Sequence, residues 1–200
     1  METKEIEVKS NVERMELFSD NYPFNLPLRI KRFESEADYV KFIKCCEGLV
    51  RKSLEYKDWH NYIIDVLGVN VCSITQERMD EVTLNVHHQV PSLYQLMQAL
   101  VNKKLAEEKE FSTFEVCLDA IELHFQNKIG FVVLLESMHE KFHNGFLQIP
   151  KNLIKGDYLY FIREYSKYLD DETLNIINER LSIDESNVNW SKDNYKVNVA

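Results

Sequence analysis

The stretch that decides the fold begins TLNVHHQVPSLYQLM (83–97) and ends FVVLLESMHEKFHNG (131–145). Its first residues alternate polar and apolar side chains, which is the period of a half-buried strand. Near its other end, His139 and His143 lie four residues apart, about one helical turn, and therefore share a helix face. Four of the six histidines of the protein lie at these two places.

The two ends of this stretch predict a small strand–strand–helix core. A first strand is expected near 83–87, with His88 falling where the strand should end before Pro91. The run FVVLL, near 131–135, is apolar and β-branched, as is typical of a buried strand. A short helix near 136–144 follows, because the Asn-Gly pair after it usually ends a helix.

The remaining segments mostly predict helices. Ser35 followed by Asp38 is a helix start signal, and Ser112 with Glu115 is a capping box. Apolar residues recur at helical spacing in the segments that these signals open and in several others. The expected helices cover residues 35–53, 56–68, 91–110, 112–126, 157–169 and 171–181. The fold class is therefore α+β, mostly helical, with a small β-hairpin core.

Three further residues have structural interpretations. His60 lies opposite the apolar stripe of its predicted helix, so we expect it to face solvent. His124 borders an apolar face, and a core histidine satisfied by a hydrogen bond is expected there. Cys72 has no second cysteine at zinc-ligand spacing, which favours a buried structural thiol.

The chain of 200 residues suits one domain with tails. Its polar ends lack strong periodicity, and the Asn-rich C-terminal segment contains an isolated Trp190. We expect a disordered leader, one mainly helical domain whose small strand–helix core is split in two, and a flexible tail. In order these are 1–15, 16–183 (with the core at 83–90 and 127–145) and 184–200.

Composition narrows the class of protein. No apolar run approaches the length of a membrane span, and the charged N-terminus lacks a signal-peptide core. The four cysteines show no framework spacing, which favours reduced thiols, a soluble protein and a cytoplasmic location. A net charge of −9 disfavours a broad electrostatic contact with nucleic acid, although PLRIKRF (27–33) is a local basic cluster.

A histidine pair leaving a strand, together with H-x3-H on a later helix, predicts one divalent metal site. Adjacent residues of a regular strand point to opposite faces, so His87 and His88 cannot both face one metal site if the strand continues through them. If the strand ends at this pair, both side chains can reach the site. One would then ligate while the other points at the substrate. The chemistry that such a site serves is phosphodiester hydrolysis, in which one histidine takes a proton from the attacking water.

The pattern strand-His-His, strand, helix with H-x3-H resembles the HNH endonucleases of the ββα-metal (His-Me finger) class, in particular the colicin DNases. The resemblance implies metal ligands at His87, His139 and His143, a general base at His88, and a divalent ion of the Mg, Mn, Ni or Zn group. Leu135 and Met138 stand where zinc-stabilised members carry cysteines, which argues against a structural zinc.

The asparagine of the HNH motif, which orients the loop carrying the general base, has no direct counterpart. Gly130 aligns with it when His139 is set on the helix histidine. Asn127, three residues earlier, substitutes only if the loop bends. The separation between His88 and His139 is also long for the class, because two helices are predicted between them.

Residues from about Tyr56 to Leu181 also resemble a group of HNH-like proteins of tailed phages. The matching segments are YKDWHNYIIDVLGVNVC, VHHQVPSLYQLM, FSTFEVCLDAIELHF and VVLLESMHEKFHNG. This resemblance implies a phage-encoded protein that works in the host cytoplasm.

Three interpretations of the histidines remain open. They serve packing or solvation only, they form a metal-dependent nuclease acting on DNA, or they belong to a catalytically degenerate HNH-like factor. The last would bind a host or phage protein, or DNA. The acidic residues Glu136 and Glu140 beside the helix histidines favour it, because DNA-cleaving sites usually carry basic neighbours. Neither a membrane partner nor an oligomeric state is indicated.

Overall fold

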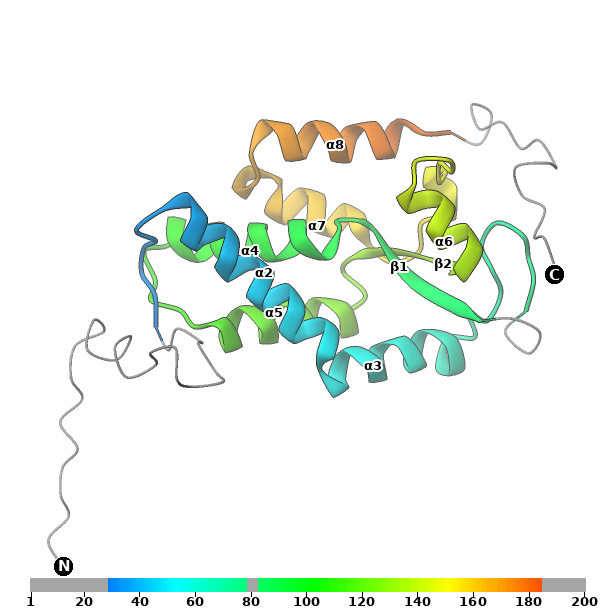
Figure 1. The fold of residues 1–200 in the computed structure, drawn as a ribbon, viewed down its shortest axis with the longest axis horizontal. Coiled ribbons are helices and arrows are strands. Elements are labelled where there is room, and N and C mark those ends of the chain that lie inside the picture. Colours follow the sequence, from blue (N-terminus) through cyan, green and yellow to red (C-terminus); the bar gives the residue numbers. More distant parts are fainter. Residues whose placement is uncertain (1–28, 79–82, 185–200) are drawn as a thin grey trace, which may run out of the picture.

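The computed structural model describes residues 29–78 and 83–184 (Figure 1). The expected leader (1–15) and Trp190 with nearly all of the expected tail lie outside the described residues. Within them, no helix is long and apolar enough to cross a membrane.

Helices dominate the described chain, and two strands interrupt them, so the prediction of a mostly helical α+β fold is confirmed. The elements are α2 (Glu36–Lys52), α3 (Leu54–Asn61), the π-helix η1 (Tyr62–Val66), β1 (Leu84–Val90), α4 (Leu93–Ala106), α5 (Thr113–Phe125), β2 (Gly130–Leu135), α6 (Glu136–His143), the 3-10 turn η2 (Lys151–Leu153), α7 (Tyr158–Tyr165), the 3-10 turn η3 (Ser166–Tyr168) and α8 (Asp171–Ser182).

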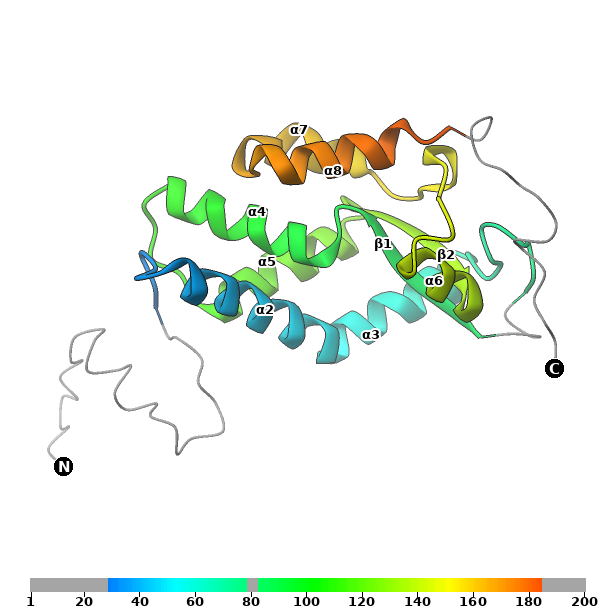
Figure 2. The ribbon, with the colours of Figure 1, turned by 45° about the horizontal axis from the view of Figure 1, so that its top comes forward.

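The helices form a layered scaffold around α4 and α5. Helices α7 and α8 lie on one side of this pair, and α2 and α3 run along the other, as Figure 2 shows. Local sequence fixes where the central helices start, because Ser92 with Gln95 and Ser112 with Glu115 form complete capping boxes. Each such cap satisfies backbone N–H groups that the first turn leaves without partners.

The two strands pair antiparallel at one end of this scaffold, with His87 opposite Val132 and His88 opposite Phe131. They do not form a tight hairpin, because α4 and α5 lie between them in sequence. The expected end of the strand at His88 is also wrong. Strand β1 continues to Val90 with an irregularity between His88 and Val90, and this continuation decides where the two histidines point.

Each face of the strand pair is covered by different helices. On one face, Trp59 from α3 packs against His88 and Phe131, with ring centroids 5.5 and 5.6 Å apart. On the other face, helix α6 folds back over β1, and the C-terminal half of α8 lies alongside (Figure 1). The side chain of His87 belongs to this second face, where its ring meets Phe142 of α6 at 4.7 Å.

The π-helix η1 corrects the expected apolar stripe of the 56–68 helix. Trp59 and Ile63 are buried as expected, but Val66 and Leu67 are 69% and 45% exposed. A π turn rotates the following side chains relative to an α-helix, which carries these two away from the core. Gly68, with φ of +67°, ends the helix as expected.

His60 does not face solvent as the sequence suggested. It is half-buried, its Nε2 is shielded, and the ring of Tyr56 lies 4.6 Å away. The expectations for two other residues are confirmed. His124 is buried with Nδ1 2.6 Å from the carbonyl oxygen of Ala120, and Cys72 is a fully buried thiol.

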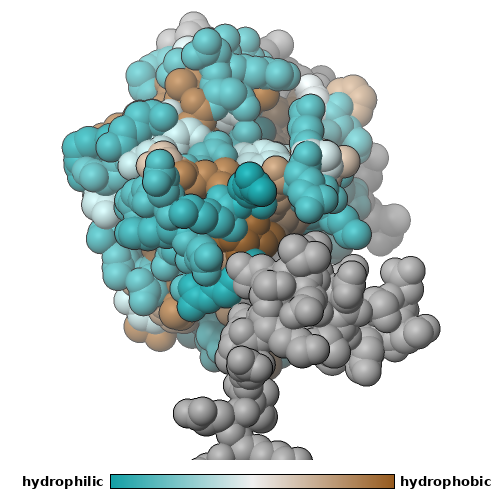
Figure 3. Space-filling model, turned by 90° about the vertical axis from the view of Figure 1, so that its left-hand side faces the viewer, coloured by the Kyte–Doolittle hydropathy of each residue, from teal (hydrophilic) through white to brown (hydrophobic). Residues whose placement is uncertain are grey.

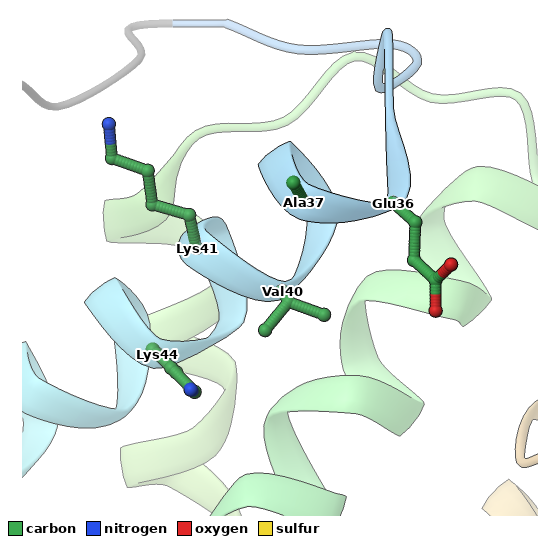
Figure 4. Close-up of a pocket in the computed structure, with 5 residues that line it drawn as sticks. All are labelled: Glu36, Ala37, Val40, Lys41 and Lys44. Atoms are coloured by element: carbon green, nitrogen blue, oxygen red, sulfur yellow. The ribbon is translucent and has the colours of Figure 1, made fainter.

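One surface hollow lies near the start of α2. Figure 3 views the end of the molecule near the start of α2, where hydrophobic surface lies among hydrophilic side chains. One depression there is lined by residues of a single helix (Figure 4), namely Glu36, Ala37, Val40, Lys41 and Lys44. Without a second wall it cannot enclose a ligand, so the histidines are the more informative feature.

Candidate metal centre

Three of the four histidines singled out in the sequence meet on the face of the strand pair that α6 covers. The ligand atoms of His87, His139 and His143 all lie within 4.8 Å of one another. Strand β1 supplies the first, and successive turns of α6 supply the other two. The three side chains differ in exposure. His87 is the most buried and its Nε2 is shielded, His139 is half-buried, and His143 is exposed.

The two helix histidines are already at ligand spacing. Their Nε2 atoms lie 3.1 Å apart, and nitrogens bound to one tetrahedral ion at 2.0–2.1 Å lie about 3.3 Å apart. Without a metal, one Nε2 donates a hydrogen bond to the other. Joint ligation through Nε2 requires both rings to carry their proton on Nδ1 instead.

His87 provides the third donor. Its Nε2 is shielded from solvent and has no hydrogen-bond partner among the residues that the structure describes. A buried polar atom without a partner is rare and calls for an explanation. Its ring centroid lies 4.9 Å from that of His139 and 5.1 Å from that of His143, so a small shift of the side chains brings three nitrogens onto one ion.

The protonation state also suits a metal site. Burial, and then the neighbouring His139 and His143, lower the pKa of His87 to about 3. Burial likewise lowers the pKa of His139. Both imidazoles are therefore neutral at pH 7, which is the form that ligates a metal. A set of three imidazole ligands suits zinc or nickel better than magnesium, which prefers oxygen ligands.

His88 does not join this cluster. Because β1 runs through it, its side chain faces the core, opposite to that of His87. It is 4% exposed, and both ring nitrogens have partners, Nε2 with His124 at 2.8 Å and Nδ1 with the hydroxyl of Tyr56 at 3.3 Å. The general-base role that the resemblance implied lacks the solvent access and the free nitrogen that it requires.

Asn127 also lies away from the cluster. It sits in the turn before β2 with φ of +56°, and its carbonyl oxygen accepts a hydrogen bond from the Asp157 backbone N–H. Asn127 precedes the start of β2 at Gly130, whereas α6, which carries His139 and His143, follows the other end of the strand at Leu135, so a role of Asn127 in orienting a histidine loop stays a prediction.

Steric contacts explain why position 130 is occupied by glycine. A Cβ atom there would lie 2.5 Å from the carbonyl oxygen of Val90 and 2.8 Å from Cβ of Tyr158. An asparagine side chain cannot occupy such a position without moving the backbone. The missing motif asparagine is thus tied to the close packing of β2 against β1 and α7.

Sequence reasoning missed one cation beside the cluster. Arg180 of α8 donates from Nη1 to the carbonyl oxygen of Gln89, at 3.1 Å, and its guanidinium carbon lies 6.0 Å from the ring centroid of Phe142. No spacing rule connects a residue in the last helix to a strand far earlier in the chain. Only the packing of α8 against β1 reveals the relationship.

Fold and site together define a mostly helical α+β protein with a three-histidine cluster on a strand–strand–helix unit. The chain belongs to the bacteriophage G278-like virion protein family, whose model matches residues 2–199. It is therefore a phage protein, as the resemblance to tailed-phage proteins implied. No curated protein and no solved structure matches the chain.

Proposed function

We propose that this virion protein binds a divalent transition-metal ion through His87, His139 and His143, and acts as a non-catalytic HNH-like binding factor. The observation that carries the proposal is the convergence of three imidazoles, one of them with a buried Nε2 that has no partner among the described residues. A site with three protein ligands keeps an open position for a ligand from outside the chain.

Loss of catalysis is the part of the proposal that rests on His88. Phosphodiester hydrolysis at an HNH-type site needs a general base that reaches the attacking water. His88 is enclosed by Tyr56, Trp59 and His124, and its nitrogens are already engaged. The geometry therefore supports the metal-ligand set that the resemblance implies, but it does not support a catalytic general base at His88.

Metal titration tests the binding proposal. Adding Zn²⁺, Ni²⁺ or Co²⁺ to the chelator-treated full chain should give one equivalent of binding by calorimetry. His143→Ala should weaken this affinity at least tenfold, because the side chain is exposed and its removal leaves the core intact. His60→Ala is the matched control, since His60 lies outside the cluster, and it should bind the metal normally. Equal binding by the wild type and His143→Ala would refute the site.

A metal-dependent endonuclease is the second candidate. One observation favours it: the cluster opens to solvent at the exposed His143, so a DNA phosphate has access to the ligand position. The test is incubation of supercoiled plasmid with Mg²⁺, Mn²⁺, Ni²⁺ or Zn²⁺. Our proposal predicts intact plasmid in every metal, whereas nicking by the wild type that His143→Ala abolishes would establish the nuclease instead.

A further inference from the structure

Arg180 occupies a defined position next to the three-histidine cluster. It is half-buried, and the hydrogen bond to the carbonyl oxygen of Gln89 uses one of its five N–H donors. The guanidinium approaches the ring of Phe142, and this ring contacts His87. Phe142 immediately precedes His143 in the sequence. Phe142 therefore links Arg180 to the histidine cluster, because its ring contacts both the guanidinium and His87.

Within residues 29–78 and 83–184, no carboxylate forms an ion pair with this guanidinium, although each ion pair found there includes at least one exposed side chain. Burial is strong enough to lower the pKa of Arg180, yet the group stays charged at neutral pH. A half-buried cation without a counterion is electrostatically unfavourable, and it indicates a binding site for an anion.

The neighbouring histidine cluster narrows the chemical class of that anion. A bound divalent ion would add positive charge to the same face as Arg180, and two positive charges together attract an anion. A guanidinium presents its donors in a planar fork that matches two oxygens of one phosphate or carboxylate group. A phosphate group has a further oxygen for the open position of the metal centre.

We propose that Arg180 and the three-histidine metal centre together bind one phosphate group, either free or as part of a nucleic-acid backbone. The inference rests on the proposed metal site and names the class of ligand that site takes. Arg180 contributes the forked hydrogen bonds, and the metal contributes the remaining oxygen contact. The phosphate offsets the charge of both cations.

The experiment uses the full chain loaded with Co²⁺, whose visible absorption spectrum reports changes in the ligands of the ion. Titration with inorganic phosphate should shift the spectrum of the wild type. Arg180→Met should lower the phosphate affinity at least tenfold while Co²⁺ still binds as tightly or more tightly, because a repelling charge is gone. Arg163→Met, on an exposed part of α7, is the matched control and should behave as the wild type.

Failure of the inference and failure of the metal site give different results. If Co²⁺ does not bind at all, the proposed function falls. If Co²⁺ binds but phosphate leaves the spectrum unchanged, or Arg180→Met binds phosphate as tightly as the wild type, the role of Arg180 is overturned.

A second titration, with a short single-stranded oligonucleotide, separates the two sources of phosphate. Tighter binding of the oligonucleotide that is also lost in Arg180→Met identifies a nucleic-acid backbone as the ligand. Binding of inorganic phosphate alone identifies a free anion.

Discussion

Nε2 of His88 lies 2.8 Å from Nε2 of His124 inside the core, and the direction of this hydrogen bond is fixed by its neighbours. Nδ1 of His124 must donate to the carbonyl oxygen of Ala120, so its Nε2 accepts. His88 therefore donates from Nε2 and accepts at Nδ1 from the hydroxyl of Tyr56. The chain holds two neutral imidazoles in defined tautomers, and this structural role occupies the residue that the HNH pattern would use as a base.

Acidification should destabilise the protein through these buried histidines. Burial lowers the pKa of His124 to about 4. Since this lies below the unfolded-state value of about 6.5, the unfolded chain binds more protons between pH 6.5 and 4, and stability falls as pH falls through that window. We expect His124 alone to cost about 2 kcal/mol between pH 7.5 and pH 5. Urea denaturation at several pH values measures this slope.

The comparison variant for the pH experiment is His124→Gln. It should be less stable than the wild type at pH 7.5, and the difference should shrink toward pH 5 because the variant lacks this proton-linked loss. Parallel pH dependences for the two proteins would contradict the assignment. Burial also lowers the pKa of His60 to about 4, so the variant should keep part of the slope.

Removing the Tyr56 hydroxyl should test the direction of the hydrogen-bond chain. In Tyr56→Phe, Nδ1 of His88 loses its donor in a buried setting, and an unpaired buried acceptor costs about 1–3 kcal/mol. Chemical denaturation measures the loss. Tyr62→Phe, at the exposed edge of η1, is the control and should change stability by less than about 0.5 kcal/mol. Equal effects of the two substitutions would show that the hydroxyl of Tyr56 does not stabilise His88.

Gly130→Ala should destabilise the fold. Its Cβ would meet backbone and side-chain atoms of Val90, Ile154 and Tyr158 at 2.5–2.9 Å, and overpacking of this kind costs about 1–3 kcal/mol. Gly48→Ala is an informative counterpart, because that glycine lies within α2 with no atom within 4 Å of an added Cβ. Alanine should stabilise that helix by about 1 kcal/mol. Thermal melts of both variants give the comparison, and a stable Gly130→Ala protein would refute the steric argument.

Metal should raise the melting temperature if the histidine cluster binds it. A ligand present at about 100 times its Kd stabilises the native state by about 2.7 kcal/mol. We therefore expect Zn²⁺ or Ni²⁺ to raise the melting temperature of the wild type and to leave His139→Ala nearly unchanged. A chelator should reverse the shift. An equal rise in both proteins would point to metal bound elsewhere.

Much of the fold was predictable because its signals are local. Ser35 and Ser112 mark helix starts through contacts three residues away, and the strand at 131–135 follows from a continuous apolar run. The histidine cluster was predictable in part for the same reason, since H-x3-H fixes a helix face. The length of β1 was not, because pairing with β2, from a distant part of the chain, extends the strand past His88.

The remaining differences come from tertiary packing. His60 was expected to face solvent, but its ring lies 4.6 Å from that of Tyr56, one turn earlier in α3, and its Nε2 is shielded in the folded chain. The position of Arg180 depends on how α8 docks against β1, which no sequence spacing encodes. Sequence alone could not explain why position 130, which aligns with the asparagine of the HNH motif, is glycine. The close approach of Val90 to Gly130 exists only in the folded chain.

The insertion of α4 and α5 between the paired strands divides the histidine cluster along the chain. A break in the connection between these helices, at residues 107–112, would leave His87 on one fragment and His139 with His143 on the other. Neither fragment alone would hold three histidine ligands. Reassembly of the two halves would then recreate the cluster. If the cluster binds a metal ion as proposed, the ion would favour the joined state over the separated pieces, and the two fragments would act as a metal-responsive split pair.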